Sequence, residues 1–443
     1  MTPEEEGEHV GGGGFRVAGA RALEVLRSAQ LGEGFWRPLL WLRVAAALGA
    51  RRCEVTARQS SLSFVFDGRP LSRTLLNEPL AVFDAARAPA EARWLAYALV
   101  HSAVPGAVVT ITSGHGSDRR ARRFDHQGQG TNLPAAAGAD TDVLVDWPTV
   151  APYGDGPWNW VLSGKAAAPL LAGAEAVPFE LKTPSGPVTP WEKRKEPEAV
   201  VVRDGERRIR IVLGGGRRLG FHHLGVRVGG TPLDDLALPV SIDVDDPGLT
   251  LDASLGAVVE DHAYHRCVAA GRDAAVRHGL ARLERHAKAM RLCANLLCAR
   301  PGLRRHWKAA LAAPERVDRR LPWVARALGA LTGRRVPASD ALRVARTAQF
   351  TAFLRDAATE HLRGRAFDAR LPLGLALWET PLLFSATGRP LSLAELDLDE
   401  RPAALWEKPA PAPAGIGAMM VWALSSEDAA FAAAFPRRKA RMG

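Results

Sequence analysis

Two histidines have the type and spacing that come closest to a metal site. His262 and His265 lie three positions apart in a predicted helix, with Glu260, Asp261 and Cys267 nearby. Imidazole, carboxylate and thiolate groups at such spacing can bind zinc. An exposed helical face explains the same pattern, and the sequence offers no second ligand cluster, so we expect no metal.

Glycine-rich segments that could hold a phosphate group lack the surroundings that such binding requires. Gly214–Gly216 lies between two predicted strands and is interpreted as a hairpin, whereas a dinucleotide-binding loop leads from a strand into a helix. The Ser-Gly-Lys triplet at 163–165 lacks the earlier glycine and the following Ser or Thr of a P-loop. Neither segment predicts a nucleotide site.

The positive charge of the chain is concentrated in residues 300–346. Twelve basic residues stand there against three acidic ones, a surplus close to the net charge of +10. Such a surplus attracts nucleic acid or an acidic protein surface, and it is also found on solvated helix faces. The candidates for nucleic-acid contact are Arg304, Arg305, Arg319 and Arg320.

Composition indicates a folded protein of several domains. The chain has 443 residues, 47% apolar and 24% charged, which is enough for a large core. Its four cysteines form no Cys-x-x-Cys pair, so neither a zinc knuckle nor a disulfide framework is expected. The sequence shows neither a signal-peptide pattern nor an apolar run long enough for a membrane span, so we expect a cytoplasmic protein.

Helices and strands must position these residues, and their order predicts an α+β fold. The N-terminal part predicts helices at 15–31, 38–50 and 89–103 and strands at 53–57, 62–66, 107–113 and 142–147. Gly49 is a stop signal for the second helix, Asp67-Gly68 predicts a turn, and residues 114–140 predict a hairpin or a loop. Further strands are predicted at 199–203, 207–213, 219–228 and 238–244, followed by a helix from Ser254.

Breaks in pattern and composition divide the chain into five segments. After a tail at 1–14 we expect an α/β sandwich at 15–147 and a middle α/β domain at 148–274. A helical domain at 275–370 and a small α/β module at 371–443 follow. In the last module, Ser392 and Glu395 have the spacing of a helix capping box.

Several strings resemble the HtpG-type (90-kDa heat-shock) chaperones of the gyrase, HtpG, histidine kinase and MutL (GHKL) ATPase superfamily. The N-terminal strings are LGARRCEVTA at 48–57, LAYALVHSAVPGAVVTITSGHG at 95–116 and DTDVLVDWP at 140–148. The middle-domain strings are the segments at 169–188 and 236–268. The resemblance implies a GHKL-type ATP-binding sandwich followed by the chaperone's middle domain.

The residues that hydrolyse ATP in that family are missing from the matching positions. Hydrolysis needs a carboxylate to activate water, a magnesium ligand and positive charge at the γ-phosphate. Leu40 or Arg43 replaces the family's glutamate. Val44 replaces its asparagine, and Ala47, one turn further along the helix, offers no carboxylate instead. Leu255 replaces the middle-domain arginine. The resemblance therefore implies a chaperone-like frame without the hydrolytic chemistry.

Part of the adenine side of the family's site survives. Asp67, followed by Gly68, matches the aspartate that accepts the adenine amino group, and Thr141 matches the threonine beside the ring. The simpler explanation of Asp67 is that it caps a tight turn, because aspartates are common in turns. The family's glycine-rich lid is missing, since residues 71–94 contain no glycine, so binding of ATP or ADP without hydrolysis is left open.

These observations give a first hypothesis and two alternatives. The first is an HtpG-like pseudo-ATPase that acts as a protein-binding scaffold, a client-binding module or a regulator. The second is an active, divergent ATPase in which Glu24 is the base. The third is a nucleic-acid-binding protein that uses residues 300–346. The sequence does not identify the client or the oligomeric state.

Overall fold

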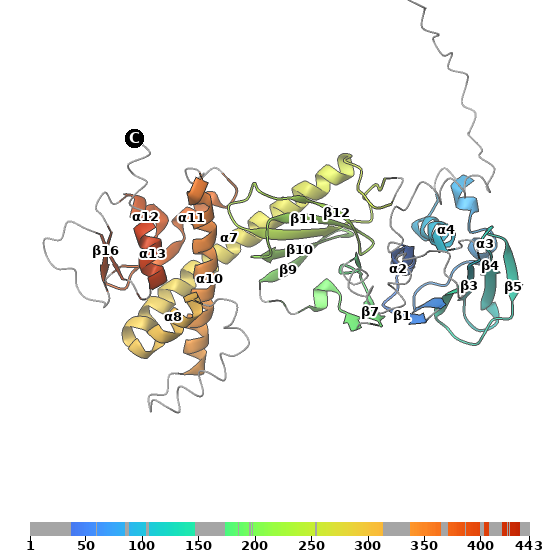
Figure 1. Ribbon diagram of the computed structural model, residues 1–443, viewed down its shortest axis with the longest axis horizontal. Coiled ribbons are helices and arrows are strands. Elements are labelled where there is room, and N and C mark those ends of the chain that lie inside the picture. The colour runs from blue at the N-terminus through green and yellow to red at the C-terminus, as the bar shows by residue number, and fades with distance from the viewer. Residues whose placement is uncertain are drawn as a thin grey trace, which may run out of the picture.

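The computed structural model shows an α+β protein in which two sheets and a group of helices follow one another along the longest axis (Figure 1). It describes residues 37–58, 60–84, 88–102, 106–146, 173–184, 186–194, 196, 198–252, 255–312, 337–364, 371–385, 387–398, 403–406, 419–422, 424 and 426–434. The expected tail and the helix at 15–31 lie outside these residues.

The first sheet has eight strands in the order β5-β4-β3-β6-β2-β1-β7-β8. Its strands are β1 (Arg52–Arg58), β2 (Ser61–Phe66), β3 (Val108–Ser113), β4 (Arg120–Phe124), β5 (Gly130–Leu133), β6 (Thr141–Asp146), β7 (Glu180–Thr183) and β8 (Gly186–Val188). The predicted strands at 53–57, 62–66 and 107–113 are confirmed, and the segment 114–140 contains the β4–β5 hairpin. This sheet takes strands from both sides of the expected boundary at residue 147.

Helices α2 (Arg37–Ala47) and α4 (Ala90–Ser102) form a core with this sheet, and α3 (Arg73–Asn77) lies nearby. The side chains of α2 are buried from Leu39 to Ala45, as expected for a helix that is apolar on nearly every face. Gly49 has φ +72°, and the amide of Ala50 donates to the carbonyl of Ala45 at 3.0 Å. This Schellman motif ends α2 at the predicted glycine.

The second sheet has five strands in the order β12-β11-β13-β10-β9. They are β9 (Ala199–Asp204), β10 (Arg207–Leu213), β11 (Arg218–His223), β12 (Val226–Pro232) and β13 (Val240–Asp245). The interpretation of Gly214–Gly216 as a hairpin is wrong, because β13 lies between β10 and β11. The single strand predicted at 219–228 is two strands, which turn at Leu224 and Gly225 with φ of 52° and 82°.

One long helix, α7 (His262–Ala299), joins the second sheet to the helical end of the molecule (Figure 1). It begins at His262 instead of Ser254, because the Asp261 side chain caps its first turn by accepting from the amides of Ala263 and Tyr264. Its 38 residues span about 57 Å at 1.5 Å per residue. The expected boundary at residue 274 falls inside this helix.

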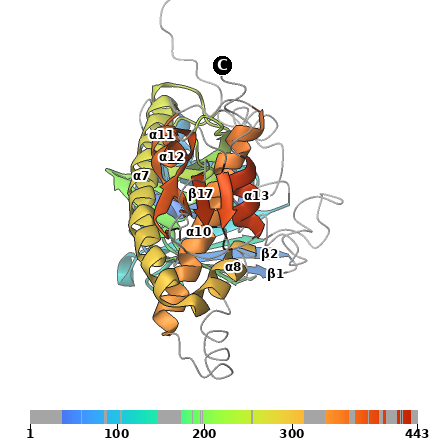
Figure 2. The same cartoon turned by 90° about the vertical axis from the view of Figure 1, so that its left-hand side faces the viewer.

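The C-terminal half packs around α7 (Figure 2). Its elements are α8 (Arg304–Ala312), α10 (Ala338–Gly364), α11 (Gly374–Glu379), β14 (Pro381–Phe384), β15 (Pro390–Ser392), α12 (Leu393–Leu398), β16 (Ala403–Trp406), β17 (Met419–Trp422) and α13 (Ser426–Ala434). The predicted capping box is confirmed: the Ser392 amide donates to Glu395 Oε2 at 2.8 Å, and the Glu395 amide donates to Ser392 Oγ at 3.2 Å. Within the described residues, none of the helices is both long and apolar enough to cross a bilayer.

Candidate functional site at the junction of the two sheets

The face of α2 that resembles the family's catalytic helix is packed into the protein. Leu40 and Val44 are 2% and 0% exposed and belong to the core of the first sheet. Ala47 is half-buried in the last turn. The aliphatic side chains of Leu40 and Val44 have neither a carboxylate nor an amide that could orient water or bind magnesium.

Arg43, on the same helix, contacts the segment that follows the second sheet in the chain. Its Nη1 and Nη2 atoms each lie 3.5 Å from the carbonyl oxygen of Leu255, and its Cζ atom lies 4.6 Å from the ring centroid of Trp94. Arg43 is 2% exposed, and burial lowers the pKa of its guanidinium to about 9. Arg43, one of the two candidates for the glutamate position in the resemblance, is therefore in direct contact with Leu255.

Leu255 occupies an unusual backbone conformation at this contact. Its φ is 57°, in the left-handed region that is costly for a residue with a branched side chain. The side chain is 7% exposed and joins the core of the first sheet, as does Val226. Apolar burial of residues from both sheets in one core holds the two sheets together.

Asp67 caps the start of the first strand. Its Oδ1 atom accepts hydrogen bonds from the backbone amides of Arg51 and Arg52, at 2.7 and 2.8 Å. Gly68 follows with φ +132°, and a Cβ there would lie 3.0 Å from the carbonyl oxygen of Leu48. Asp67 therefore acts as a turn cap, but the turn it holds lies between α2 and β1 and is not its own Asp-Gly turn.

Thr141 lies close to Asp67 but is engaged with its neighbours. Phe66, the residue before Asp67, is paired with Thr141 across strands β2 and β6, so both side chains stand at the same end of the sheet. Thr141 is 4% exposed, and its Oγ1 atom lies 2.8 Å from Ser113 Oγ, which in turn accepts from the Leu71 amide at 3.0 Å. This chain of hydrogen bonds fixes both hydroxyl groups.

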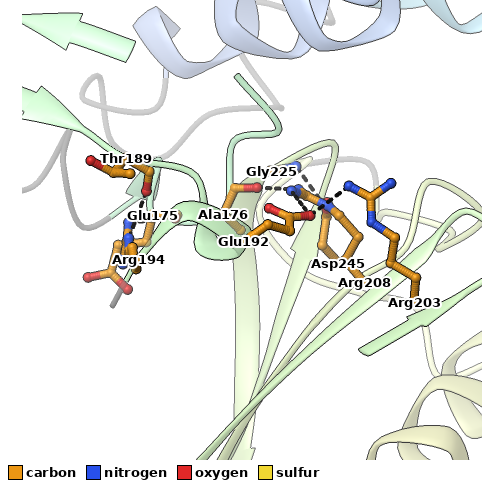
Figure 3. Close-up of polar contacts among 9 residues, drawn as sticks. All are labelled: Glu175, Ala176, Thr189, Glu192, Arg194, Arg203, Arg208, Gly225 and Asp245. Carbon is orange, nitrogen blue, oxygen red and sulfur yellow. Dashed lines mark hydrogen bonds and ion pairs between the residues drawn. The ribbon is translucent and has the colours of Figure 1, made fainter. Parts of the chain in front are cut away.

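A buried ion pair lies on the other side of the junction (Figure 3). Arg208 on β10 donates from Nε to Asp245 Oδ2 at 3.1 Å, and its Nη2 atom donates both to the same oxygen and to the carbonyl of Ala176. Asp245 Oδ1 accepts from the amide of Gly225 at 2.8 Å. Through the carbonyl of Ala176, the pair therefore attaches the segment before β7, a strand of the first sheet, to the second sheet.

Glu192 and Arg194 extend this network at the surface (Figure 3). Glu192 Oε1 lies 2.9 Å from Arg203 Nη2 and 3.6 Å from Arg208 Nη1. Arg194 donates to the carbonyls of Thr189 and Glu175, at 2.7 and 2.9 Å. Arginines thus contact both the segment before β7, at Glu175 and Ala176, and the segment after β8, at Thr189 and Glu192.

Two adjacent histidines on β11 pack against different tryptophans. The His222 ring lies 5.2 Å from the Trp191 ring, and the His223 ring lies 5.1 Å from the Trp94 ring. Burial, together with the nearby positive charge of Arg43, lowers the pKa of His223 to about 4. His223 is thus neutral at physiological pH and acts as a packing group between Trp94 and the sheet.

The remaining sequence candidates do not join this junction. Among the described residues no group of three or more His, Cys, Asp or Glu side chains could hold a metal ion, and His262 stands at the exposed start of α7. Arg304 packs over the Trp422 ring, with 4.9 Å from its Cζ atom to the centroid, and Arg305 is half-buried. Arg319 and Arg320 lie outside the described residues.

Sequence reasoning missed the polar residues that build the junction: Arg208, His223 and Asp245. Each is buried, with 4–6% of its surface exposed. Their only signal was an unusual one, namely charged or titratable residues within strands that are otherwise apolar. Buried charges in strands require partners, and the sequence does not reveal which strands become neighbours.

Comparison with known proteins identifies no family for this chain. No protein-family model matches the sequence, and no curated protein matches it. Among solved structures, the chain is similar to the N-terminal domain of a DNA repair protein, with 11% identity and a TM-score of 0.38, over 58% of this chain and 97% of that chain. A likeness at this TM-score supports no conclusion about function.

Proposed function

We propose that this protein is a nucleotide-independent relative of the HtpG-type chaperones that binds other proteins as a scaffold or client-binding module. The observation that carries the proposal is the contact of Arg43 with the carbonyl of Leu255. In the family that the sequence resembles, nucleotide closes a clamp between the N-terminal and middle domains. In this protein Arg43 and Leu255, which the resemblance aligns with positions on either side of that clamp, contact each other directly.

The chemistry of α2 supports the loss of hydrolysis. Leu40 and Val44 are buried in the core, and Arg43 carries the wrong charge for a magnesium ligand. Replacing a catalytic carboxylate by any of these side chains removes the group that would orient water. A protein with this helix would have to act by binding.

The helical end of the molecule offers apolar side chains for a protein partner. Of the large exposed apolar residues in the described part of the chain, Leu280 and Leu292 lie on α7 and Leu375 lies on the neighbouring helix α11. Leu375 is 56% exposed. Contact with the apolar surface of an unfolded client would remove these side chains from water, which is favourable.

The experiment is an assay of aggregation with thermally denatured citrate synthase, with and without ATP or ADP. We expect the protein to reduce light scattering in proportion to its concentration and to the same extent with either nucleotide. Leu280→Ser/Leu375→Ser should weaken this protection, whereas Val259→Ser, which changes an exposed apolar residue outside α7 and α11, should not. Absence of protection, or protection only with ATP, would contradict the proposal.

A further inference from the structure

A pocket of about 370 Å³ lies between α7 and α10, far along the chain from the junction. Arg282, His286 and Ala289 line it from one face of α7, and the facing side of α10 contributes a second row that includes Arg343, Arg346 and Phe350. Figure 2 shows the two helices crossing at this end of the molecule. The volume is in the range of pockets that hold small molecules.

The charge of the pocket is positive, since three lining side chains are arginines and none is acidic. Arg282 is already neutralised, because its Nε and Nη2 atoms each lie 2.8 Å from an oxygen of Glu198. Arg343 and Arg346 are exposed and make no ion pair with any residue in the described part of the chain. Two guanidinium groups one helical turn apart can share one oxyanion.

His286 is the buried polar group of the pocket. It is 1% exposed, and burial lowers its pKa to about 3, so the ring is neutral. One ring nitrogen hydrogen-bonds to the backbone of Pro381, whose only polar group is a carbonyl, so that nitrogen carries the proton. The other nitrogen, Nε2, is an acceptor with no partner among the described residues. An unsatisfied buried acceptor costs free energy that a donor on a ligand would recover.

Apolar and aromatic side chains, together with the hydroxyl residues Ser339 and Thr347, form the rest of the wall. Phe350 lies under the Arg282 guanidinium, with 3.7 Å from Cζ to the ring centroid, and its ring meets the His286 ring at a centroid distance of 5.3 Å. Leu342 and Ala289 complete this side. Such a surface accommodates a flat or apolar ligand body between the anionic group and the donor.

We propose that this pocket binds a small organic oxyanion, a phosphate or a carboxylate, whose anionic group lies between Arg343 and Arg346 and whose body donates a hydrogen bond to His286 Nε2. The pocket shares no residue with the contact between Arg43 and Leu255 or with the exposed leucines proposed to bind a client, so this binding is tested separately.

The test uses three probes on the full chain, with affinity measured by calorimetry. The probes are 4-hydroxyphenyl phosphate, phenyl phosphate and 4-hydroxybenzoate. We expect saturable binding of 4-hydroxyphenyl phosphate or 4-hydroxybenzoate, and the tighter of the two identifies the oxyanion. Removing the hydroxyl, as in phenyl phosphate, should weaken phosphate binding about fivefold, the value of one hydrogen bond of about 1 kcal/mol. Saturable binding of none of the probes would overturn the proposal.

A matched pair of charge variants separates this pocket from general attraction of anions. Arg343→Gln/Arg346→Gln removes two charges from the pocket and should weaken binding by at least about tenfold. Arg285→Gln/Arg291→Gln removes two charges from exposed positions of α7 outside the pocket and should leave affinity unchanged. Equal affinity of the two double variants would overturn the proposal. In wild type, the bound hydroxylated probe should also shift the nitrogen-15 NMR signal of His286 Nε2.

Discussion

The guanidinium of Arg43 rests against the backbone carbonyl of Leu255, a residue 212 positions further along the chain. Both contact distances are 3.5 Å, at the long limit for a hydrogen bond, and Nε has no partner in the described part of the protein. The charge is thus poorly compensated, and the aromatic face of Trp94 provides much of its surroundings. We infer that the contact contributes to packing between the two sheets more than it stabilises the positive charge of Arg43.

Arg43→Met tests whether the charge is needed. Methionine fills a similar volume and needs no hydrogen bond. We therefore expect the free energy of unfolding either to increase or to fall by less than about 1 kcal/mol. Arg43→Ala leaves a cavity and should cost about 3 kcal/mol. Urea unfolding measures both, and an equal loss in the two variants would mean that the junction depends on the charge.

Asp67→Ala should destabilise the turn between α2 and β1. It leaves the amides of Arg51 and Arg52 without their acceptor, at an expected cost of about 2 kcal/mol. Asp67→Asn keeps one acceptor oxygen and should cost about half as much. Thermal unfolding compares the three proteins, and a neutral Asp67→Ala variant would show that the carboxylate is held for another purpose.

Gly225→Ala should disrupt the junction. Gly225 has φ +82°, and a Cβ there would lie 2.4 Å from the Cα atom of Val177, a backbone atom that cannot move aside alone. We expect a loss of more than about 3 kcal/mol. Gly205→Ala is the matched control, because Gly205 has φ +62° with nothing within 4 Å of the added Cβ, so only backbone strain of about 1 kcal/mol applies. Similar losses at the two positions, measured by urea unfolding, would contradict the close approach.

Acid should weaken the fold through His223 and His286. Burial lowers their pKa values from 6.5 to about 4 and about 3, so between these values and pH 6.5 the unfolded state binds protons that the folded state does not. Stability should therefore fall as the pH decreases below 6.5, by about 1.4 kcal/mol per pH unit for each ring. His223→Gln removes one ring and should lose less stability between pH 7 and pH 5 than wild type. The same pH dependence in both proteins would exclude this role for His223.

Local patterns in the sequence predicted most of the elements and little of their assembly. Short runs of apolar and β-branched residues located β1, β2 and β3, and Gly49 and Ser392 located a helix end and a helix start. These signals depend on neighbouring residues alone. The insertion of β13 between β10 and β11 depends on pairing between distant strands and left no local signal. The hairpin turn at Leu224 and Gly225 was missed because leucine is uncommon in turns, and the sequence does not show that Leu224 adopts a positive φ.

The candidate site shows the same division. The local Asp-Gly pair predicted a turn cap at Asp67, but the two amides that its carboxylate accepts from lie 15 and 16 residues earlier in the chain, which no local signal indicated. The roles of Arg208 and Asp245 depend on which strands become neighbours in the second sheet. Arg43 was identified as a position in a resemblance, and only the structure reveals its contact with Leu255.

The most direct test of the central claim is calorimetry of the full chain with ATP and Mg²⁺, followed by an assay of ATP turnover. The account predicts no saturable heat at about 100 μM protein, a concentration that would detect dissociation constants up to the same order, and no turnover. Saturable binding that Asp67→Asn abolishes, together with turnover that Glu24→Gln abolishes, would contradict it and establish an active ATPase.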